Sequence, residues 1–315
     1  MAGPTRSTSP AHPDYSSTSA SGFIPSIWSG KLVDKLYAST AYGEIANTYH
    51  QGEIKQMGDS VQIRTTPSIT ISDYEIGGGL TYEKPTSDKV DLQIDQAKSF
   101  NFEINDVDAY QADINLMDDW SNDAGQQMKI AIDTDINAYA YTEVAAANAG
   151  ATAGVKSGDI NLGEADAPLS VTKANVLDIL VDASTVLDEQ NVPDDERWVI
   201  LPPWMCGMLK KSDLRDASIM GDDTSAFRNG KLGMLDRFKV FISNNLDVVT
   251  DATTSTKCTN VIFGHKKALT FASQMTNMET LPNPSDFGKL IRGLNVYGRK
   301  VIDPNAIGTL YVDRG

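Results

Sequence analysis

Sulfur and imidazole groups are scarce in this chain. Two cysteines, Cys206 and Cys258, occur among 315 residues, too few for a disulfide framework or a metal site with several cysteine ligands. The three histidines, His12, His50 and His265, are scattered and lack the His-Glu-x-x-His spacing of a zinc helix. We therefore expect no metal site, and we expect both cysteines to be free, buried thiols.

Positive charge and long apolar runs are also in short supply. The chain has 27 Lys and Arg against 42 Asp and Glu, a formal net charge of -15 and a pI near 4.6. This balance disfavours tight binding to phosphates. No stretch approaches the roughly 18 consecutive apolar residues of a membrane span, and the first residues lack a secretory signal pattern. We expect a soluble intracellular product with no membrane partner.

The motifs of the common cofactor sites are missing as well. There is no Walker loop and no Gly-x-Ser-x-Gly elbow, and Gly77–Gly79 lacks the spacing of a dinucleotide turn. Asp133, Asp135 and Asn137 imitate the start of a calcium loop, but Ala138 stands where that loop needs glycine. We expect no cofactor.

Adjacent acidic residues are the remaining catalytic candidates. Asp222 and Asp223, and the run Asp194 to Glu196, could supply a pair of carboxylates to a glycosidase. Acidic neighbours in loops are more often solvated charge. We therefore expect no enzymatic role for them.

One long amphipathic helix dominates the middle of the chain. Its apolar residues recur every three or four positions from Val107 to Tyr139: Val107, Tyr110, Ile114, Met117, Trp120, Ala124, Met128, Ile132, Ile136 and Tyr139. Gly125 weakens it by about 1 kcal/mol relative to Ala. We expect a sheet to lie under the apolar stripe.

The region before this helix alternates with period two and is predicted to be β structure. The alternating residues are Val61 and Ile63, Ile69 and Ile71, Val90, Leu92 and Ile94, and Phe100, Phe102 and Ile104. Gly77–Gly79 and the polar segment Glu83 to Lys89 lie between these strands and cannot form a core. We expect a long two-stranded ribbon that lies on another molecule or another domain. An ordinary hairpin folded back on its own domain is the alternative.

The first 22 residues are mostly Ser, Thr, Pro, Gly and Ala, which bury too little apolar surface to order alone. They form either a floppy leader or an arm that orders against a neighbouring subunit. Ile27, Trp28, Val33, Leu36 and Tyr37 predict a short helix from Ser26 to Tyr37, capped by Ser26.

The second half of the chain predicts a mixed unit, so the fold class is α+β. After a loop from Gly150 to Pro168, Thr172 is expected to cap a helix that Pro193 ends. The apolar face of this helix is Val176, Leu177, Leu180, Ala183, Val186 and Leu187. We next expect a strand at Arg197 to Leu201 and a helix at Trp204 to Lys211, which Pro202 and Pro203 introduce. Three further strands are expected at Phe238 to Ser243, Asn260 to Phe263 and Ala268 to Ala272. The last stretch, Gly288 to Val312, predicts strands broken by Gly293, Gly298 and Pro304.

The order of these parts resembles the major capsid (coat) proteins of tailed double-stranded DNA bacteriophages. Three segments carry the resemblance: Leu92 to Gln111, Arg197 to Trp204, and Gly233 to Leu246; Val296 to Pro304 matches the closing strands. The resemblance implies an N-terminal arm with a short helix (residues 1–50), an extended β-hairpin loop (51–105), a spine helix with linker of the peripheral domain (106–168), an axial α/β domain (169–283) and closing strands (284–315).

The same resemblance implies a structural, non-enzymatic protomer of an icosahedral head in the virion. Copies form hexamers and pentamers around packaged double-stranded DNA, which touches the acidic shell only by weak, non-specific contact. The implied partners are a separate scaffolding protein, a portal protein and, in some shells, a decoration protein. The candidates for contact between subunits are Ile27, Trp28, Tyr74, Ile76, Leu80 and Tyr82. An encapsulin-type shell protein and an acidic hydrolase or sugar-binding protein are the alternatives.

Overall fold

The computed structural model describes residues 37–49, 60–64, 66–67, 69–74, 76, 82–87, 89–105, 116–212, 233–284 and 286–315. Several predictions fall outside this part of the chain. They are the arm with its helix at Ser26 to Tyr37, the first part of the long helix (107–115), and the pair Asp222 and Asp223.

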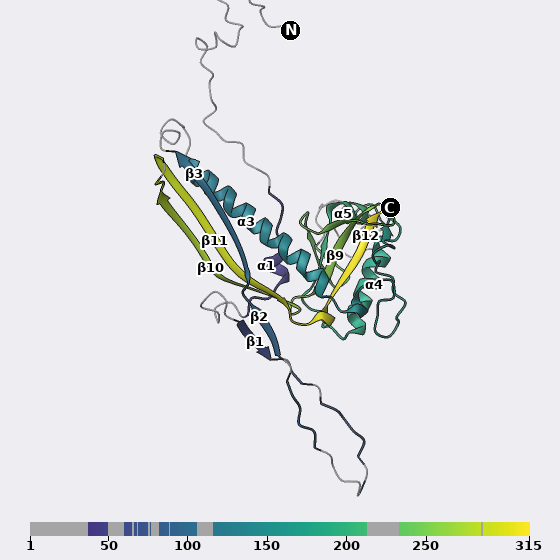
Figure 1. Cartoon of the computed structure of the whole chain (residues 1–315). Helices are drawn as coiled ribbons and strands as arrows, with labels where there is room; N and C mark the ends of the chain where they lie inside the picture. Colours follow the sequence, from purple (N-terminus) through teal and green to yellow (C-terminus); the bar gives the residue numbers. More distant parts are fainter. Residues whose placement is uncertain are drawn as a thin grey trace, which may run out of the picture.

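A long helix on an elongated sheet forms one half of the molecule (Figure 1). The antiparallel sheet has the order β10 (Leu269–Pro282), β11 (Gly288–Val301), β3 (Gln96–Asn105), and α3 (Leu116–Ala140) lies along it. Ile132 and Ile136 of the predicted stripe are buried, and the Trp120 ring packs edge-on against Phe102 of β3 at 5.9 Å. Within the described residues, the predicted long helix and the sheet beneath it are confirmed.

Glycine does not interrupt β11, so the prediction of breaks at Gly293 and Gly298 was wrong. A Cβ at Gly293 would lie 2.3 Å from the Phe100 ring, and one at Gly298 would lie 2.4 Å from the carbonyl oxygen of Gln93. Both positions therefore need glycine for the close approach of a neighbouring strand rather than for a turn. The break at Pro304 is confirmed, because a short 3-10 helix begins there.

The base of the ribbon is a two-stranded antiparallel sheet of β1 (Ser60–Arg64) and β2 (Lys89–Gln93). A small cluster of Leu92, Ile94, Ala272 and Val296 packs this base against the elongated sheet. Residues 69–74 form no strand, so the strand expected at Ile69 and Ile71 was wrong. In the described part of the chain this segment has neither a pairing strand nor an apolar surface beneath it.

The other half of the molecule is a mixed seven-stranded sheet. The order is β4 (Leu169–Val171), β12 (Ile307–Arg314), β9 (Lys257–His265), β5 (Arg197–Leu201), β7 (Phe238–Ile242) and β6 (Met234–Leu235), with β8 (Val248–Thr250) also paired to β9. Helices α4 (Val176–Glu189) and α5 (Pro203–Leu209) share one core with this sheet. None of the described helices is long and apolar enough to cross a membrane.

Several local predictions hold in this half. The predicted apolar face of α4 is buried or half-buried, β5 has the predicted bounds, and Cys206 and Cys258 are buried free thiols. The prediction that Thr172 caps α4 was wrong, because Asn175 precedes the helix. The Asn175 side chain instead accepts hydrogen bonds from the Thr172 amide and hydroxyl.

Two strand-to-strand connections join the sheets: β9 runs into β10 through residues 265–269, and β11 runs into β12 through residues 301–307. The chain also passes from α3 through residues 141–168 into β4. The pairings place β3 and β10 beside β11 in one sheet. The predicted division had assigned β3 to the extended loop and β10 to the axial domain. That domain division remains a prediction.

Candidate inter-subunit surface

The extended loop, defined as the described residues among 66–87, holds the most exposed large apolar side chains of the described chain. Ile71, Ile76 and Tyr82 are 90%, 94% and 90% exposed. In Figure 1 the loop continues beyond β1 and β2, away from both large sheets. Burying one such side chain contributes about 1.5–3 kcal/mol. Clustered exposed apolar residues are typical of interaction surfaces.

The two lengths of the extended loop are tied to one another. The backbone amide of Thr70 donates to Oε2 of Glu83 at 3.0 Å. This contact links the outgoing and returning lengths at one point of the described loop.

The structure gathers three of the six predicted contact residues on this loop. Tyr74, Ile76 and Tyr82 are all exposed, and their contact with another subunit remains a prediction. Ile27, Trp28 and Leu80 lie outside the described residues. The prediction omitted Ile69 and Ile71, which are 62% and 90% exposed on the same loop. Their alternation was visible in the sequence but was assigned to a strand.

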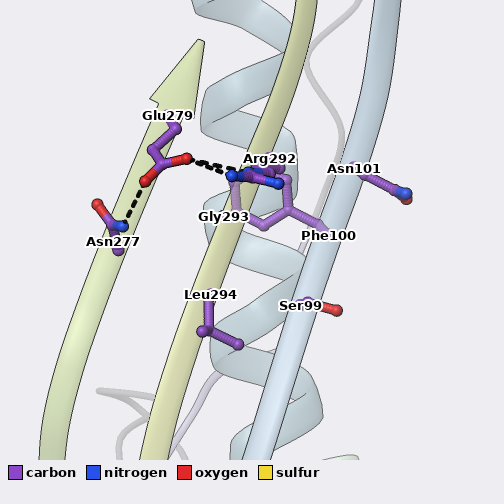
Figure 2. A pocket seen from close by; sticks show the side chains of 8 residues that line it. All are labelled: Ser99, Phe100, Asn101, Asn277, Glu279, Arg292, Gly293 and Leu294. Carbon is purple, nitrogen blue, oxygen red and sulfur yellow. Dashed lines mark hydrogen bonds and ion pairs between the residues drawn. The ribbon is translucent and has the colours of Figure 1, made fainter. Parts of the chain in front are cut away.

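A second surface is the face of the elongated sheet that points away from α3. Residues paired across antiparallel strands share a face, so Phe100, Phe102 and their partners face α3. Asn101 and the residues paired with it face away from α3. A depression of about 350 Å³ lies among Ser99, Phe100, Asn101, Asn277, Glu279, Arg292, Gly293 and Leu294 (Figure 2).

The centre of this depression is a small polar cluster on β10 and β11. Arg292 donates from Nη2 to Glu279 Oε2 at 2.6 Å, and Asn277 donates to the other carboxylate oxygen at 3.0 Å. Leu294 and Leu290 are only half-buried on the same face. The face is open and of mixed polarity. Such polarity is typical of surfaces between proteins.

A third feature is the anchoring of the N-terminal segment, defined as residues 37–47. Asp133 of α3 is fully buried, and its Oδ1 accepts the backbone amides of Ala41 and Tyr42 at 2.9 Å each. These amides stand at the start of α1 (Tyr42–Ile45), which has no side-chain cap of its own. Asn245, between β7 and β8, donates to the other oxygen of Asp133 at 2.8 Å. Asp133 thus joins three parts of the chain.

The end of the N-terminal segment binds the crossing between the two sheets. Asn47 bonds through its backbone to Leu269 and Phe271, and its side-chain oxygen accepts the hydroxyl of Thr270 at 2.9 Å. Its amide nitrogen donates to the carbonyls of Lys266 and Lys267. The segment that connects the arm to the ribbon therefore packs on the connection between β9 and β10, which we call the joint between the two sheets.

Asp135 serves a similar structural purpose. The Tyr297 hydroxyl donates to its Oδ2 at 2.7 Å, and Arg299 forms an ion pair with the same carboxylate. Burial, with the nearby negative charge of Asp95, raises the pKa of Tyr297 to about 12, so this phenol stays a neutral donor. The run that imitated a calcium loop consists of helix residues that bind the rest of the fold.

Two of the site types considered from the sequence, a metal site and an acidic catalytic pair, have these counterparts in the described residues. No group of three or more His, Cys, Asp or Glu side chains there could hold a metal ion. Asp194 is paired with the buried Arg197 at 3.2 Å and with Arg237 at 2.9 Å, which leaves it holding the chain before β5.

Comparisons with known proteins agree with this architecture. The model of a family described as phage capsid protein matches residues 89–310. A structure from Mycobacterium phage Che8 is 25% identical, with a TM-score of 0.75, covering 91% of this chain and 97% of that one. The capsid of cyanophage P-SCSP1u is 16% identical, with a TM-score of 0.69, covering 96% and 97%. The capsid of a native GTA particle is 13% identical, with a TM-score of 0.65, covering 96% and 99%. A search of curated proteins found no match.

The family match spans the greater part of the chain, and it includes β2, the elongated sheet, α3 and most of the seven-stranded sheet. The chain belongs to the phage capsid protein family: it has the α+β fold of tailed-phage capsids and is a structural protein of an icosahedral bacteriophage capsid, located in the virion.

Proposed function

We propose that copies of this chain assemble as hexamers and pentamers into a closed shell around double-stranded DNA, with each extended loop lying on a neighbouring copy. The observation that carries the proposal is the loop itself. Ile71, Ile76 and Tyr82 are at least 90% exposed, and residues 69–74 have no strand partner in the described chain. An isolated segment of this kind is unstable in water and gains burial only from another molecule.

We propose the face of the elongated sheet away from α3 as the surface that receives the loop. Leu290 and Leu294 are half-buried there, so a covering segment removes further apolar area from water. Asn101, Asn277 and the Arg292–Glu279 pair line the same depression as Leu294 and supply hydrogen-bonding groups there. Such mixed surfaces are typical of contacts between proteins.

Charge supports a container that holds DNA without binding it tightly. The net charge is -15, and the open sheet face carries Glu103 and Glu279 beside Arg292. Because phosphate binding depends on clustered Lys and Arg, the proposed contact with packaged DNA is weak and non-specific. The proposal includes no catalytic role. A separate scaffolding protein, a portal protein and, in shells that carry one, a decoration protein are the proposed partners.

The test compares assembly of the full-length chain with that of a loop variant, each expressed with its scaffolding protein. Tyr74→Ser, Ile76→Ser and Tyr82→Ser together are expected to abolish shells in negative-stain micrographs. The thermal unfolding of the subunit should stay unchanged, because these side chains make no core contact. Val181→Ser on α4, which is 52% exposed, is the matched control and should assemble normally.

Normal shells from the triple variant would refute loop contact as the basis of assembly. A wild-type chain that stays a compact monomer would refute the assembly proposal as a whole. Native particles that hold an enzyme and no nucleic acid would identify an encapsulin-type shell instead of a genome container.

A further inference from the structure

The turn between β9 and β10 is the shorter of the two strand-to-strand connections between the sheets. The amide of Ala268 donates to the carbonyl of His265 at 3.0 Å and closes the turn. The Ala268 carbonyl accepts the amide of Ile302 from the second crossing at 2.7 Å. Both strand-to-strand connections between the sheets therefore meet at this turn.

His265 caps the turn with its side chain. Its Nδ1 accepts the backbone amide of Lys267 at 3.1 Å, and the residue is 2% exposed. A nitrogen that accepts a hydrogen bond carries no proton, so the neutral ring holds its proton on Nε2. Among the described residues no polar atom lies within hydrogen-bond distance of Nε2. The nearest carboxylate oxygen, Oδ1 of Asp195, is 4.0 Å away.

Charged groups of both signs surround His265. Asp195 and Glu196 precede β5 and favour a protonated ring, whereas Lys267 in the turn and Arg197 on β5 oppose it. Arg197 is itself paired with Asp188 and Asp194. Burial is the largest influence, and it lowers the pKa of His265 below its ordinary value.

We propose that His265 is a pH-sensitive catch on the joint between the two sheets, closed when the ring is neutral and released when Nδ1 takes up a proton. A protonated Nδ1 cannot accept the Lys267 amide, so two N–H groups then face one another. The ring also acquires a charge in a buried position. Both effects favour an open turn.

Opening the turn affects the N-terminal segment as well. Asn47 donates to the carbonyls of Lys266 and Lys267, which belong to the turn that His265 caps. Loss of the cap therefore loosens the contact through which residues 37–47 rest on the joint. Protonation of one ring changes how the arm side of the chain is held against both sheets.

The sign of the pH dependence follows from the neutral ring of the closed turn. Because the pKa of His265 is lowered in the closed state, the cap contributes fully above the ordinary histidine pKa and is lost as pH falls toward the lowered value. For one proton, the equilibrium constant for opening rises by at most about tenfold per pH unit in that window.

The test is hydrogen exchange of the Lys267 amide in the full-length chain between pH 8 and pH 5, each rate corrected for intrinsic exchange. Wild type is expected to lose protection as pH falls. His265→Asn should show no such change, because an amide oxygen can accept the Lys267 amide and does not titrate. His12→Asn and His50→Asn are the matched controls and should behave as wild type. Constant protection in wild type, or an equal loss in His265→Asn, overturns the proposal.

A second measurement needs no variant and covers the case in which His265→Asn fails to fold. Exchange of the imidazole C2 proton reports the titration midpoint of each histidine in the wild-type chain. The midpoint of His265 is expected below the ordinary histidine value. A midpoint at or above the ordinary histidine value overturns the catch.

Discussion

Replacing Asp133 with alanine removes the acceptor at the start of α1. The carboxylate accepts the amides of Ala41 and Tyr42 at 2.9 Å each and the side-chain amide of Asn245 at 2.8 Å. Alanine leaves these three donors in place without their acceptor. The substitution therefore removes the hydrogen bonds that join the N-terminal segment, α3 and the connection between β7 and β8.

The magnitude depends on which donors water can reach after the change. Ala41 is 3% exposed and Asn245 is 7% exposed, so these two donors stay buried, while Tyr42 is only half-buried. An unsatisfied buried donor costs about 1–3 kcal/mol. Two of them predict a decrease of about 2–6 kcal/mol in the free energy of unfolding. Asp133→Asn keeps one oxygen for the two backbone amides but turns its NH₂ toward Asn245, and we expect a smaller decrease of about 1.5–3 kcal/mol.

The assay is urea unfolding of the unassembled full-length chain, followed by tryptophan fluorescence, together with hydrogen exchange of the Ala41 and Tyr42 amides. Both variants should unfold at lower urea in the order Ala, Asn, wild type, and both amides should lose protection in Asp133→Ala. Asp119→Ala on the exposed surface of α3 is the control and should stay within about 0.5 kcal/mol of wild type. If Asp133→Ala is as stable as this control, then the carboxylate does not hold the segment.

Two further predictions concern stability. Gly293→Val is expected to lower the free energy of unfolding by about 1–3 kcal/mol, because the added atoms meet the Phe100 ring. The double variant with Phe100→Ala should recover part of this loss in the same urea assay. No recovery would count against the contact. Asp251 accepts the amides of Thr254, Asp166 and Thr253, which lower its pKa to about 2. This lowered pKa stabilises the fold above the ordinary aspartate pKa, and the stability is lost as pH falls toward 2. Thermal unfolding of Asp251→Asn should therefore depend less on pH between about 2 and 4 than wild type does, and equal dependence would refute the assignment.

The elements that were predicted well draw their evidence from neighbouring residues. β5 is buried at all five positions and is followed by Pro202 and Pro203, so a short apolar run and a helix-starting proline determine both bounds. The apolar face of α4 repeats with helical period, and the same side chains are buried in the core. Where an element packs against a large core, the periodic spacing of its apolar residues is enough to identify it.

Partners far apart in the chain explain the predictions that were wrong or incomplete. In the sequence Gly293 indicates a strand break, but glycine is needed there because the Phe100 ring of another strand lies close to its backbone. Asp133 was recognised only as part of a rejected calcium loop, because nothing near it in the sequence points to Ala41 or Asn245. Side-chain to backbone bonds of this kind need only one acceptor and leave no periodic pattern.

The extended loop also has an apolar pattern whose burying surface cannot be identified from the sequence. Alternating apolar residues record that one face of a segment is buried, but they do not record which chain buries it. Val61 and Leu92 alternate and pair within this chain, whereas Ile71 alternates and is 90% exposed. In the proposed shell the missing surface belongs to a neighbouring copy, so the pattern at Ile69 and Ile71 describes an interface. On that proposal, a strand prediction from one sequence fails at this point because the surface that buries the segment lies on a second molecule.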